Sequence, residues 1–442
     1  MSNYIDKQYL DNLESKYNIV SDEEYSKLVH FQTTNDIPFQ RWYPYREGYS
    51  YELVDKLIKK FNITGSILDP FVGSGSSVLA ARYNNLKSYG IDVNPISIFI
   101  AKVENRNYKS TDVEYINEEI YKLSNIKPDY RHRTTEFNLA DKYFNDDILQ
   151  SLLQIRDFIN DISDEKIRDV FFLSWLSVIE SVSNVKKEGN GLKYKNRKRL
   201  KSGYINIPIK EWEDEHFPEN KFKFVKDQIL SHINIIFKDL KDNRIQSPEP
   251  NFYLGSAMDD VLKVPDKVEL TVFSPPYVNF FDYFEIHKVE LWLGQFINSH
   301  EELRKLKRTG MRSNASATVS KEINNHDEYV NHITNILAKK KLWSKKIPDV
   351  IKGYFDDMET LLRNLFIKTD KNGRVAIVIG NSAYGGIIVP SDLLVAEIAE
   401  KIGYKVENII VTRHLTTSSQ QRKYLTDVMN YMRESIVILK KE

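Results

Sequence analysis

Short apolar runs alternate with amphipathic stretches near the start of the chain. Between residues 51 and 61 the apolar positions recur at helical spacing on one face, which predicts an amphipathic helix. Strands are expected at 66–69 and 88–92, and helices at about 76–83 and 96–103. This alternation is typical of a doubly wound, mostly parallel, Rossmann-like α/β sheet.

The pattern changes at about residue 105 and returns after residue 250. Between these positions helical spacing predominates, as at 148–159 and 167–182, and a basic segment lies at 186–201. The later part resumes the alternation, with strands expected at 252–254, 268–273, 374–379, 405–411 and 435–439 and a helix at 392–401.

We therefore expect one α/β domain whose two halves are separated by an insertion. The first half, with an N-terminal segment, covers residues 1–104, and the mostly helical insertion covers 105–250. The second half covers 251–442 and contains a smaller, charged insertion at about 298–350.

The amino-acid composition excludes several kinds of catalytic and metal-binding site. The 442 residues include no cysteine, which excludes disulfides, thiolate metal sites and a cysteine nucleophile such as the one that attacks C5 of cytosine. The scattered histidines do not have metal-ligand spacing, so no metal site is predicted. No signal peptide or membrane-spanning run is apparent, which indicates a cytoplasmic protein without a membrane partner.

The first motif is a glycine turn, Asp69-Pro-Phe71-Val-Gly73-Ser-Gly75, between a strand and a helix. Such turns expose backbone N–H groups to a ligand. A phosphate-binding loop would continue with Gly-Lys, and a dinucleotide fold would have a third glycine where this chain has Val78. Both alternatives are disfavoured.

The second motif is Gly90-Ile-Asp92-Val-Asn94-Pro95, at the end of the next strand. A carboxylate at this position can accept hydrogen bonds from both hydroxyls of a ribose. The alternative is that Asp92 and Asn94 only end a strand and cap a helix.

The third motif is Ser274-Pro275-Pro276-Tyr277, directly after the expected strand 268–273. Two prolines hold a rigid turn without N–H donors, so the serine oxygen and the Pro275 carbonyl can accept the hydrogens of an amino group. Tyr277 offers a flat face on which a flipped base can stack. The alternative is an ordinary loop.

Together the three motifs resemble those of the S-adenosylmethionine (SAM)-dependent amino-methyltransferases of DNA, of the restriction-modification type. The resemblance implies that SAM is the cofactor and that the turn, Asp92 and Asn94 bind it. It also implies contacts from Phe71 and, in an aromatic segment at 42–45, from Tyr45. Many relatives have Gly-Asp at the adenine contact, where this chain has Gly255-Ser256, so Ser256 is the candidate there.

The resemblance also bears on the target atom. Family members with serine in the catalytic motif are mostly cytosine-N4 enzymes, which favours N4 of cytosine in double-stranded DNA. The alternatives are an adenine-N6 DNA methyltransferase, an RNA amino-methyltransferase and a non-catalytic DNA-binding subunit. A separate cognate restriction endonuclease is the partner that the resemblance implies.

Positive charge is concentrated in the insertion although the net charge is only +1. Residues 186–201 contain eight basic residues and one acidic residue, which could follow a phosphate backbone or form a solvated loop. The DNA-binding candidates are Lys186, Lys187, Lys193, Lys195, Arg197, Lys198 and Arg199.

Overall fold

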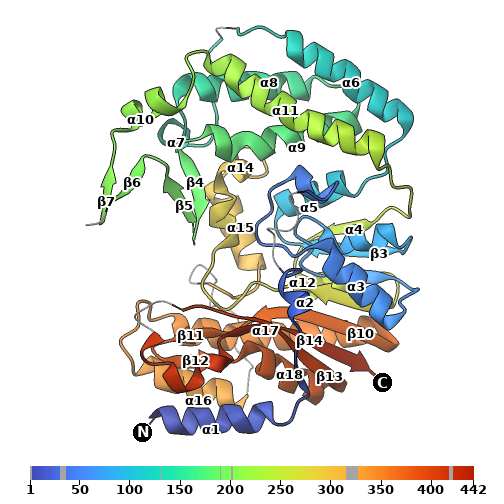
Figure 1. Cartoon of the computed structure of the whole chain (residues 1–442), viewed down its shortest axis with the longest axis vertical. Coiled ribbons are helices and arrows are strands. Elements are labelled where there is room, and N and C mark those ends of the chain that lie inside the picture. Colours follow the sequence, from blue (N-terminus) through green and yellow to red (C-terminus); the bar gives the residue numbers. More distant parts are fainter. Residues whose placement is uncertain are drawn as a thin grey trace.

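A central sheet of eight strands organises the protein in the computed structural model (Figure 1). The structure describes residues 2–29, 36–129, 131–189, 191–200, 203–314, 327–417 and 422–442. Along the sheet the order is β1-β13-β14-β10-β9-β2-β3-β8, and only β14 runs antiparallel to its neighbours. The strands are β1 Ile19–Ser21, β2 Ile67–Asp69, β3 Ser88–Asp92, β8 Asn251–Leu254, β9 Val268–Phe273, β10 Thr369–Gly380, β13 Tyr404–His414 and β14 Arg433–Lys441.

The predicted mostly parallel α/β sheet is confirmed, and it joins the two distant halves of the chain. Strand β2 pairs in parallel with β9, with Ile67 opposite Leu270. The carboxyl ends of parallel strands lie at the same edge of a sheet, so the glycine turn after β2 and the Ser-Pro-Pro-Tyr segment after β9 are neighbours.

Helices cover both faces of the sheet because its strands alternate their buried side chains. Val375 and Ile377 of β10 pack toward one layer, which includes α17 (Ile347–Lys368) and α18 (Ser391–Ile402). Ala376 and Val378 pack toward the other layer. That layer includes α3 (Tyr51–Phe61) and α4 (Ser76–Tyr83), while α5 (Pro95–Glu104) follows β3.

The insertion forms its own apolar core, shared with α5 and with residues 39–45. Its helices are α6 Ser110–Asn125, α7 Ala140–Tyr143, α8 Asp146–Asn160, α9 Glu165–Val182, α10 Ile209–His216 and α11 Lys221–Asp242. The basic segment, expected as part of a mostly helical region, instead forms two hairpins: β4 Val185–Glu188 with β5 Gly191–Tyr194, and β6 Arg197–Leu200 with β7 Gly203–Asn206. Asn190 and Lys201 of this segment lie outside the described residues.

The expected insertion at 298–350 is only partly separate from the core. Helix α15 (His300–Thr309) follows the short helices α13 (Tyr283–Ile286) and α14 (Lys288–Leu293). Beyond it, α16 (Glu328–Ala338) and the start of α17 bury Val330, Ile333 and Ile347 in the core beside the sheet. The reason is topological, since α17 belongs to the crossover between the parallel strands β9 and β10.

The described part of the N-terminal segment forms α1 (Ser2–Glu14), β1 and α2 (Glu23–Ser26). Leu10 and Leu13 of α1 join the main core, and β1 extends the sheet beside β13. Further short elements are α12 (Ala257–Asp260), β11 (Ser382–Tyr384), β12 (Ile387–Val389) and the 3-10 helices η2 (Gln40–Trp42), η3 (Val261–Lys263) and η4 (Thr426–Tyr431). Within the described ranges, no helix is long and apolar enough to span a bilayer.

Candidate active site

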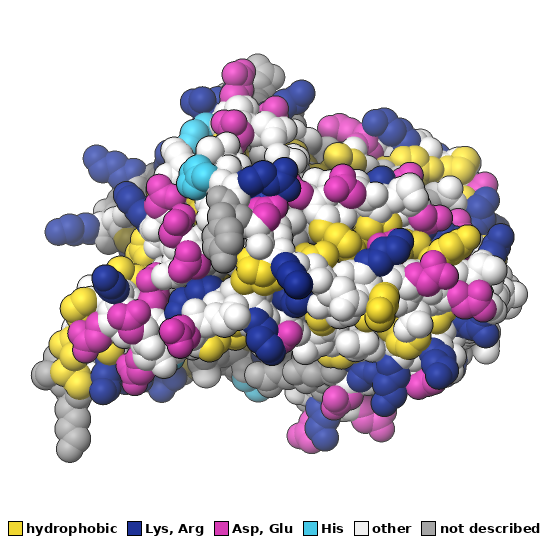
Figure 2. Space-filling view, turned by 90° about the horizontal axis from the view of Figure 1, so that it is seen from above, with side chains coloured by type: hydrophobic (Ala, Val, Ile, Leu, Met, Phe, Trp, Pro, Cys, Tyr) yellow, Lys and Arg dark blue, Asp and Glu magenta, His cyan; other side chains and the backbone are white. Residues whose placement is uncertain are grey.

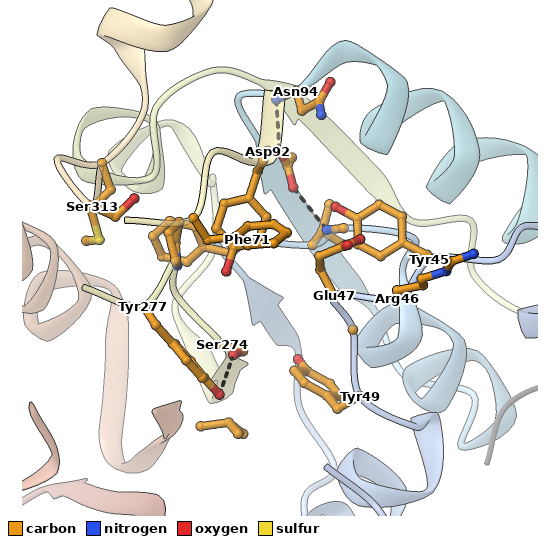
Figure 3. A pocket seen from close by; sticks show the side chains of 18 of the residues that line it. Tyr45, Arg46, Glu47, Tyr49, Phe71, Asp92, Asn94, Ser274, Tyr277 and Ser313 are labelled. Carbon is orange, nitrogen blue, oxygen red and sulfur yellow. Dashed lines mark hydrogen bonds between the residues drawn. The ribbon is translucent and has the colours of Figure 1, made fainter. Parts of the chain in front are cut away.

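A cavity of about 390 Å³ lies at the carboxyl edge of the sheet, where the three motifs meet. Its size is within the range of small-molecule sites. Figure 3 shows Asp92 and Asn94 on one side, Ser274 and Tyr277 on another, and Phe71 between them. A chain segment that runs from residue 45 to residue 49 closes a further side. We call this segment the strap.

The glycine turn is shaped by backbone conformations that glycine tolerates best. Gly73 has φ +51° and lines the cavity, and a Cβ there would lie 3.0 Å from the Tyr45 ring. Gly75 has φ +96° and begins α4 behind the cavity, where a Cβ would lie 2.5 Å from Nδ2 of Asn105. Both glycines therefore allow a close approach that a side chain would block.

Asp69 is buried and its carboxylate is fully engaged in holding the turn. It accepts hydrogen bonds from the hydroxyls of Tyr49 (2.8 Å) and Ser77 (2.5 Å) and from the backbone N–H of Phe71 (2.9 Å). Burial raises the pKa of Asp69 to about 6 although these bonds favour the charged form. The geometry makes Asp69 a support for the cavity wall.

Asp92 faces the same cavity from the end of β3. Its two carboxylate oxygens accept backbone N–H bonds from Gly73 (3.0 Å) and Asn94 (2.8 Å), and burial raises its pKa to about 6. The Asn94 side chain accepts from the N–H of Ile96 and caps α5. Asn94 therefore does cap a helix, as the alternative interpretation expects, but Asp92 and Asn94 also line the cavity.

Of the aromatic segment 42–45, only Tyr45 lines the cavity. Its ring stacks on His287 with 5.5 Å between ring centroids, and its hydroxyl lies 3.0 Å from that of Ser97. Trp42 is fully buried and donates its indole N–H to Asp239 of α11 at 2.9 Å. It anchors the strap to the insertion.

The structure places Ser256 differently from the prediction. Ser256 is buried after β8, its hydroxyl contacts the Met258 sulfur at 4.0 Å, and it is not one of the residues that line the cavity. The Asp260 side chain fills the space beside Gly255. An adenine contact from Ser256 is therefore not favoured by the geometry.

The Ser-Pro-Pro-Tyr segment turns away from β9 at the cavity. Ser274, Pro276 and Tyr277 line it, whereas Pro275 is buried behind them. The Ser274 hydroxyl donates to the Tyr277 oxygen at 3.5 Å, and the Tyr277 hydroxyl donates to Glu434 at 2.8 Å. Burial raises the pKa of Tyr277 well above its usual value, so the phenol stays protonated.

Comparison with known proteins shows which enzymes this chain is similar to. Type II methyltransferase M.BsoBI from Geobacillus stearothermophilus is 28% identical over 93% of this chain and 88% of its own length. M.AvaI from Anabaena variabilis is 27% identical over 87% and 83%, and M.MvaI from Kocuria varians is 22% identical over 91% and 89%. The chain is a relative of the type II methyltransferases. No family model matches it.

These relatives confirm the resemblance to restriction-modification DNA methyltransferases that the motifs indicate. The predicted cofactor, S-adenosylmethionine, is confirmed with it.

Two of the lysines predicted to bind DNA are held inside the protein. Nζ of Lys187 pairs with Glu290 at 2.6 Å, and the Lys187 side chain is only 8% exposed. Nζ of Lys195 donates to backbone carbonyls at the end of α9, including that of Ser183 at 2.8 Å, and burial lowers its pKa to about 8. These contacts correct the expectation for both lysines, because their charges serve internal partners.

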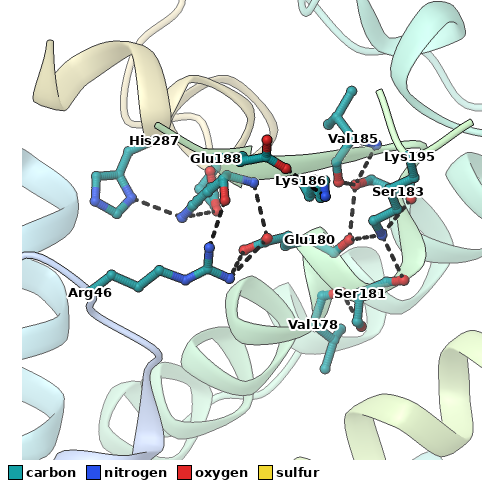
Figure 4. A network of polar contacts seen from close by, with 12 residues as sticks. Arg46, Val178, Glu180, Ser181, Ser183, Val185, Lys186, Glu188, Lys195 and His287 are labelled. Carbon is teal, nitrogen blue, oxygen red and sulfur yellow. Dashed lines mark hydrogen bonds and ion pairs between the residues drawn. The ribbon is translucent and has the colours of Figure 1, made fainter. Parts of the chain in front are cut away.

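The same region ties the insertion to the strap. Arg46, which lines the cavity, donates to the Lys187 carbonyl at 2.7 Å and to Glu180 of α9 at 3.0 Å (Figure 4). Lys187 also contacts the imidazole of His287, on which Tyr45 stacks. Hairpin β4–β5 is thereby linked to the wall of the cavity.

The other basic candidates remain at the surface. Lys186 and Lys193 both pair with the exposed Glu188. Arg197, Lys198 and Arg199 lie on the exposed strand β6. These five stay candidates for DNA contact.

The motifs did not identify several residues that line the cavity. They come from the strap, from the chain after the Ser-Pro-Pro-Tyr segment and from the last strands. None of them belongs to one of the three motifs, so only the fold shows that they lie at the site. The set comprises Arg46, Glu47, Tyr49, Asn279, Tyr283, Lys307, Asn314, Arg413 and Glu434.

Proposed function

We propose that this protein is a site-specific DNA methyltransferase that transfers a methyl group from SAM to the exocyclic amino nitrogen of a flipped base, namely N4 of cytosine. One observation supports this best: the Ser274–Tyr277 segment and Asp92 line one cavity although 181 positions separate Ser274 from the end of β3. A cognate restriction endonuclease, acting at the same site in cytoplasmic DNA, would be its functional partner.

The cavity fits the cofactor. Gly73 leaves room that a Cβ would fill, Phe71 supplies an apolar wall, and Asp92 offers a half-buried carboxylate to hydroxyl groups. Asp92, Asn94, Gly73, Phe71 and Tyr45 would hold SAM, while Asp69 lines the cavity and supports the turn and Gly75 shapes the turn from behind. The bound cofactor supplies an electrophilic methyl group on a sulfonium.

Ser274 and the Pro275 carbonyl would activate the target. An exocyclic amino nitrogen is a poor nucleophile because its lone pair is delocalised into the ring. Two acceptors on its hydrogens favour a pyramidal nitrogen with an available lone pair. Tyr277 would hold the flipped base by stacking, worth about 1–3 kcal/mol.

Serine at position 274 supports cytosine as the base, since serine enzymes of this kind are mostly cytosine-N4 specific. Adenine N6 is the second candidate, because Ser274 and the Pro275 carbonyl could also accept from an adenine amino group. An RNA target is the third.

Hairpin β6–β7 is the part of the insertion best suited to contact DNA. All of its described strand residues are exposed, and Arg197 stacks on Tyr204 with 4.1 Å to the ring centroid. A two-stranded ribbon fits the major groove. By contrast, the face seen from above carries interspersed basic and acidic side chains (Figure 2), so its described residues offer no single-sign surface to a polyanion.

Removing the three basic side chains of β6 should weaken DNA binding and its salt dependence. If Arg197, Lys198 and Arg199 each neutralise a phosphate, the slope of log K against log salt should fall by about 2–3 in the triple alanine variant. Fluorescence anisotropy with a duplex at several salt concentrations measures this. The matched control replaces three other exposed lysines of the insertion, Lys127, Lys238 and Lys241, with alanine. An unchanged slope in the β6 variant would remove the hairpin from the DNA surface.

SAM affinity should fall in mild acid because Asp92 must be ionised to accept two hydroxyl bonds. With a pKa of about 6, Asp92 takes up a proton as the pH falls through 6. Between pH 7.5 and pH 5 the Kd should therefore rise about tenfold. Calorimetry on wild type and Asp92→Asn measures this, and a full rise in the variant would assign the effect to another group, such as Asp69.

Transfer of labelled methyl groups tests the proposed function. The protein is incubated with methyl-labelled SAM and either unmethylated duplex DNA of mixed sequence or RNA. Label should enter the DNA and not the RNA. Label in RNA alone, or in neither polymer, would refute the proposal.

A further inference from the structure

Glu434 is a buried carboxylate beside the catalytic turn that none of the motifs includes. It is 3% exposed and lies at the start of β14, 160 positions after Ser274. It lines the cavity together with Arg413 from the end of β13. Arg413 donates to its carboxylate from Nε at 2.7 Å and from Nη2 at 3.2 Å.

The paired carboxylate fixes the direction of the hydrogen bonds that reach Ser274. Arginine is always charged, and an ionised carboxylate can only accept. The Tyr277 hydroxyl therefore gives its one hydrogen to Glu434, at 2.8 Å. The Tyr277 oxygen is left as an acceptor, and the Ser274 hydroxyl donates to it at 3.5 Å.

This direction matters because a serine hydroxyl can either donate or accept. Only an acceptor suits an amino group that presents two hydrogens. When Ser274 gives its own hydrogen to Tyr277, its lone pairs remain for the base. We propose that Glu434 is a positioning residue that, through Tyr277, orients the Ser274 hydroxyl as an acceptor for the target amino group.

Packing around the Tyr277 ring holds the hydrogen bonds from Ser274 to Tyr277 and from Tyr277 to Glu434 in place. The Tyr277 ring lies against Gly380 at the end of β10, where a Cβ would come within 2.8 Å of the ring. The ring is thus held between Gly380 and the bond to Glu434. This inference rests on the proposed function, because it concerns how the proposed catalytic serine is oriented.

Two variants test the link. In Glu434→Gln the amide can donate to Tyr277, so the tyrosine hydroxyl is free to donate toward Ser274 and the direction reverses. Tyr277→Phe keeps the ring and the Arg413–Glu434 pair but removes the hydroxyl. Glu407→Gln is the matched control, since Glu407 accepts from Arg374 in the same two-bond manner and does not line the cavity.

Single-turnover methylation of duplex DNA is measured with SAM-saturated protein, together with the Kd of SAM and DNA. We expect Glu434→Gln and Tyr277→Phe each to lower the rate by about 10–100-fold, with both Kd values within twofold of wild type. The double variant should be no slower than the slower single variant. Glu407→Gln should match wild type.

Three results would overturn the inference: a wild-type rate in Tyr277→Phe, losses that multiply in the double variant, or a loss confined to the Kd values. If Glu434→Gln does not fold, the rate of Tyr277→Phe still shows whether the Tyr277 hydroxyl contributes to methyl transfer. Methylation of DNA by the wild type tests the proposed function separately, and the ratios between variants and wild type test the role of Glu434.

Discussion

Replacing Ser274 with alanine is expected to lower the rate of methyl transfer by about 10²–10³-fold, the loss typical when one group that stabilises a transition state is removed. Alanine keeps the turn but removes the acceptor that the amino nitrogen needs as it becomes pyramidal. SAM binding should stay close to wild type, because the contacts predicted to hold the cofactor lie at Asp92 and the glycine turn.

Single-turnover kinetics and calorimetry on the same preparation separate the two effects. Ser66→Ala is a suitable control, since Ser66 lies at the opposite end of β2 and its hydroxyl donates to the Lys267 carbonyl. A Ser274→Ala protein that methylates DNA at the wild-type rate would show that the serine oxygen does not activate the base.

Replacing Asp92 with alanine should mainly weaken SAM binding and should affect the methyl-transfer rate less, which is the reverse of the Ser274→Ala result. Loss of two hydrogen bonds to a charged group should raise the Kd for SAM by about 10²–10⁴-fold, at about 1.5–3 kcal/mol for each bond. At saturating SAM the methyl-transfer rate should recover much of its wild-type value, because Asp92 does not face the amino group in the proposed arrangement.

Isothermal titration calorimetry measures the loss, with Asp161→Ala as a control at the exposed end of α8. Thermal unfolding of the SAM-free proteins shows whether the fold is kept, since the Asp92 carboxylate also accepts the N–H groups of Gly73 and Asn94. Wild-type affinity in a folded Asp92→Ala protein would refute the assignment of Asp92 to the cofactor.

The sequence predicts the sheet elements because their signals are local. The helical face at 51–61, the glycine turn and the apolar strand 268–273 depend on neighbouring residues, and all three form at the expected positions. Strand β1 is different, since three residues at the sheet edge are stabilised by pairing with β13 and not by their own pattern. The hairpins of the basic segment likewise depend on pairing across the turn.

The same distinction applies to the site. Asp92 and Ser274 belong to motifs that can be recognised along the chain, and the structure brings them to one cavity. Glu434 could not be predicted, because its contact with Tyr277 follows from β14 entering the sheet antiparallel beside β10. Lys187 and Lys195 look like DNA-binding lysines in sequence, and only their buried partners show otherwise.

The most direct test of the central claim is mass spectrometry of nucleosides from DNA that has been incubated with the protein and SAM. One measurement identifies both the polymer and the methylated atom. The account predicts N4-methyldeoxycytidine, absent from a parallel sample made with Ser274→Ala. N6-methyldeoxyadenosine in its place would contradict the choice of cytosine, and DNA without any methylated amino group would contradict the proposed function itself.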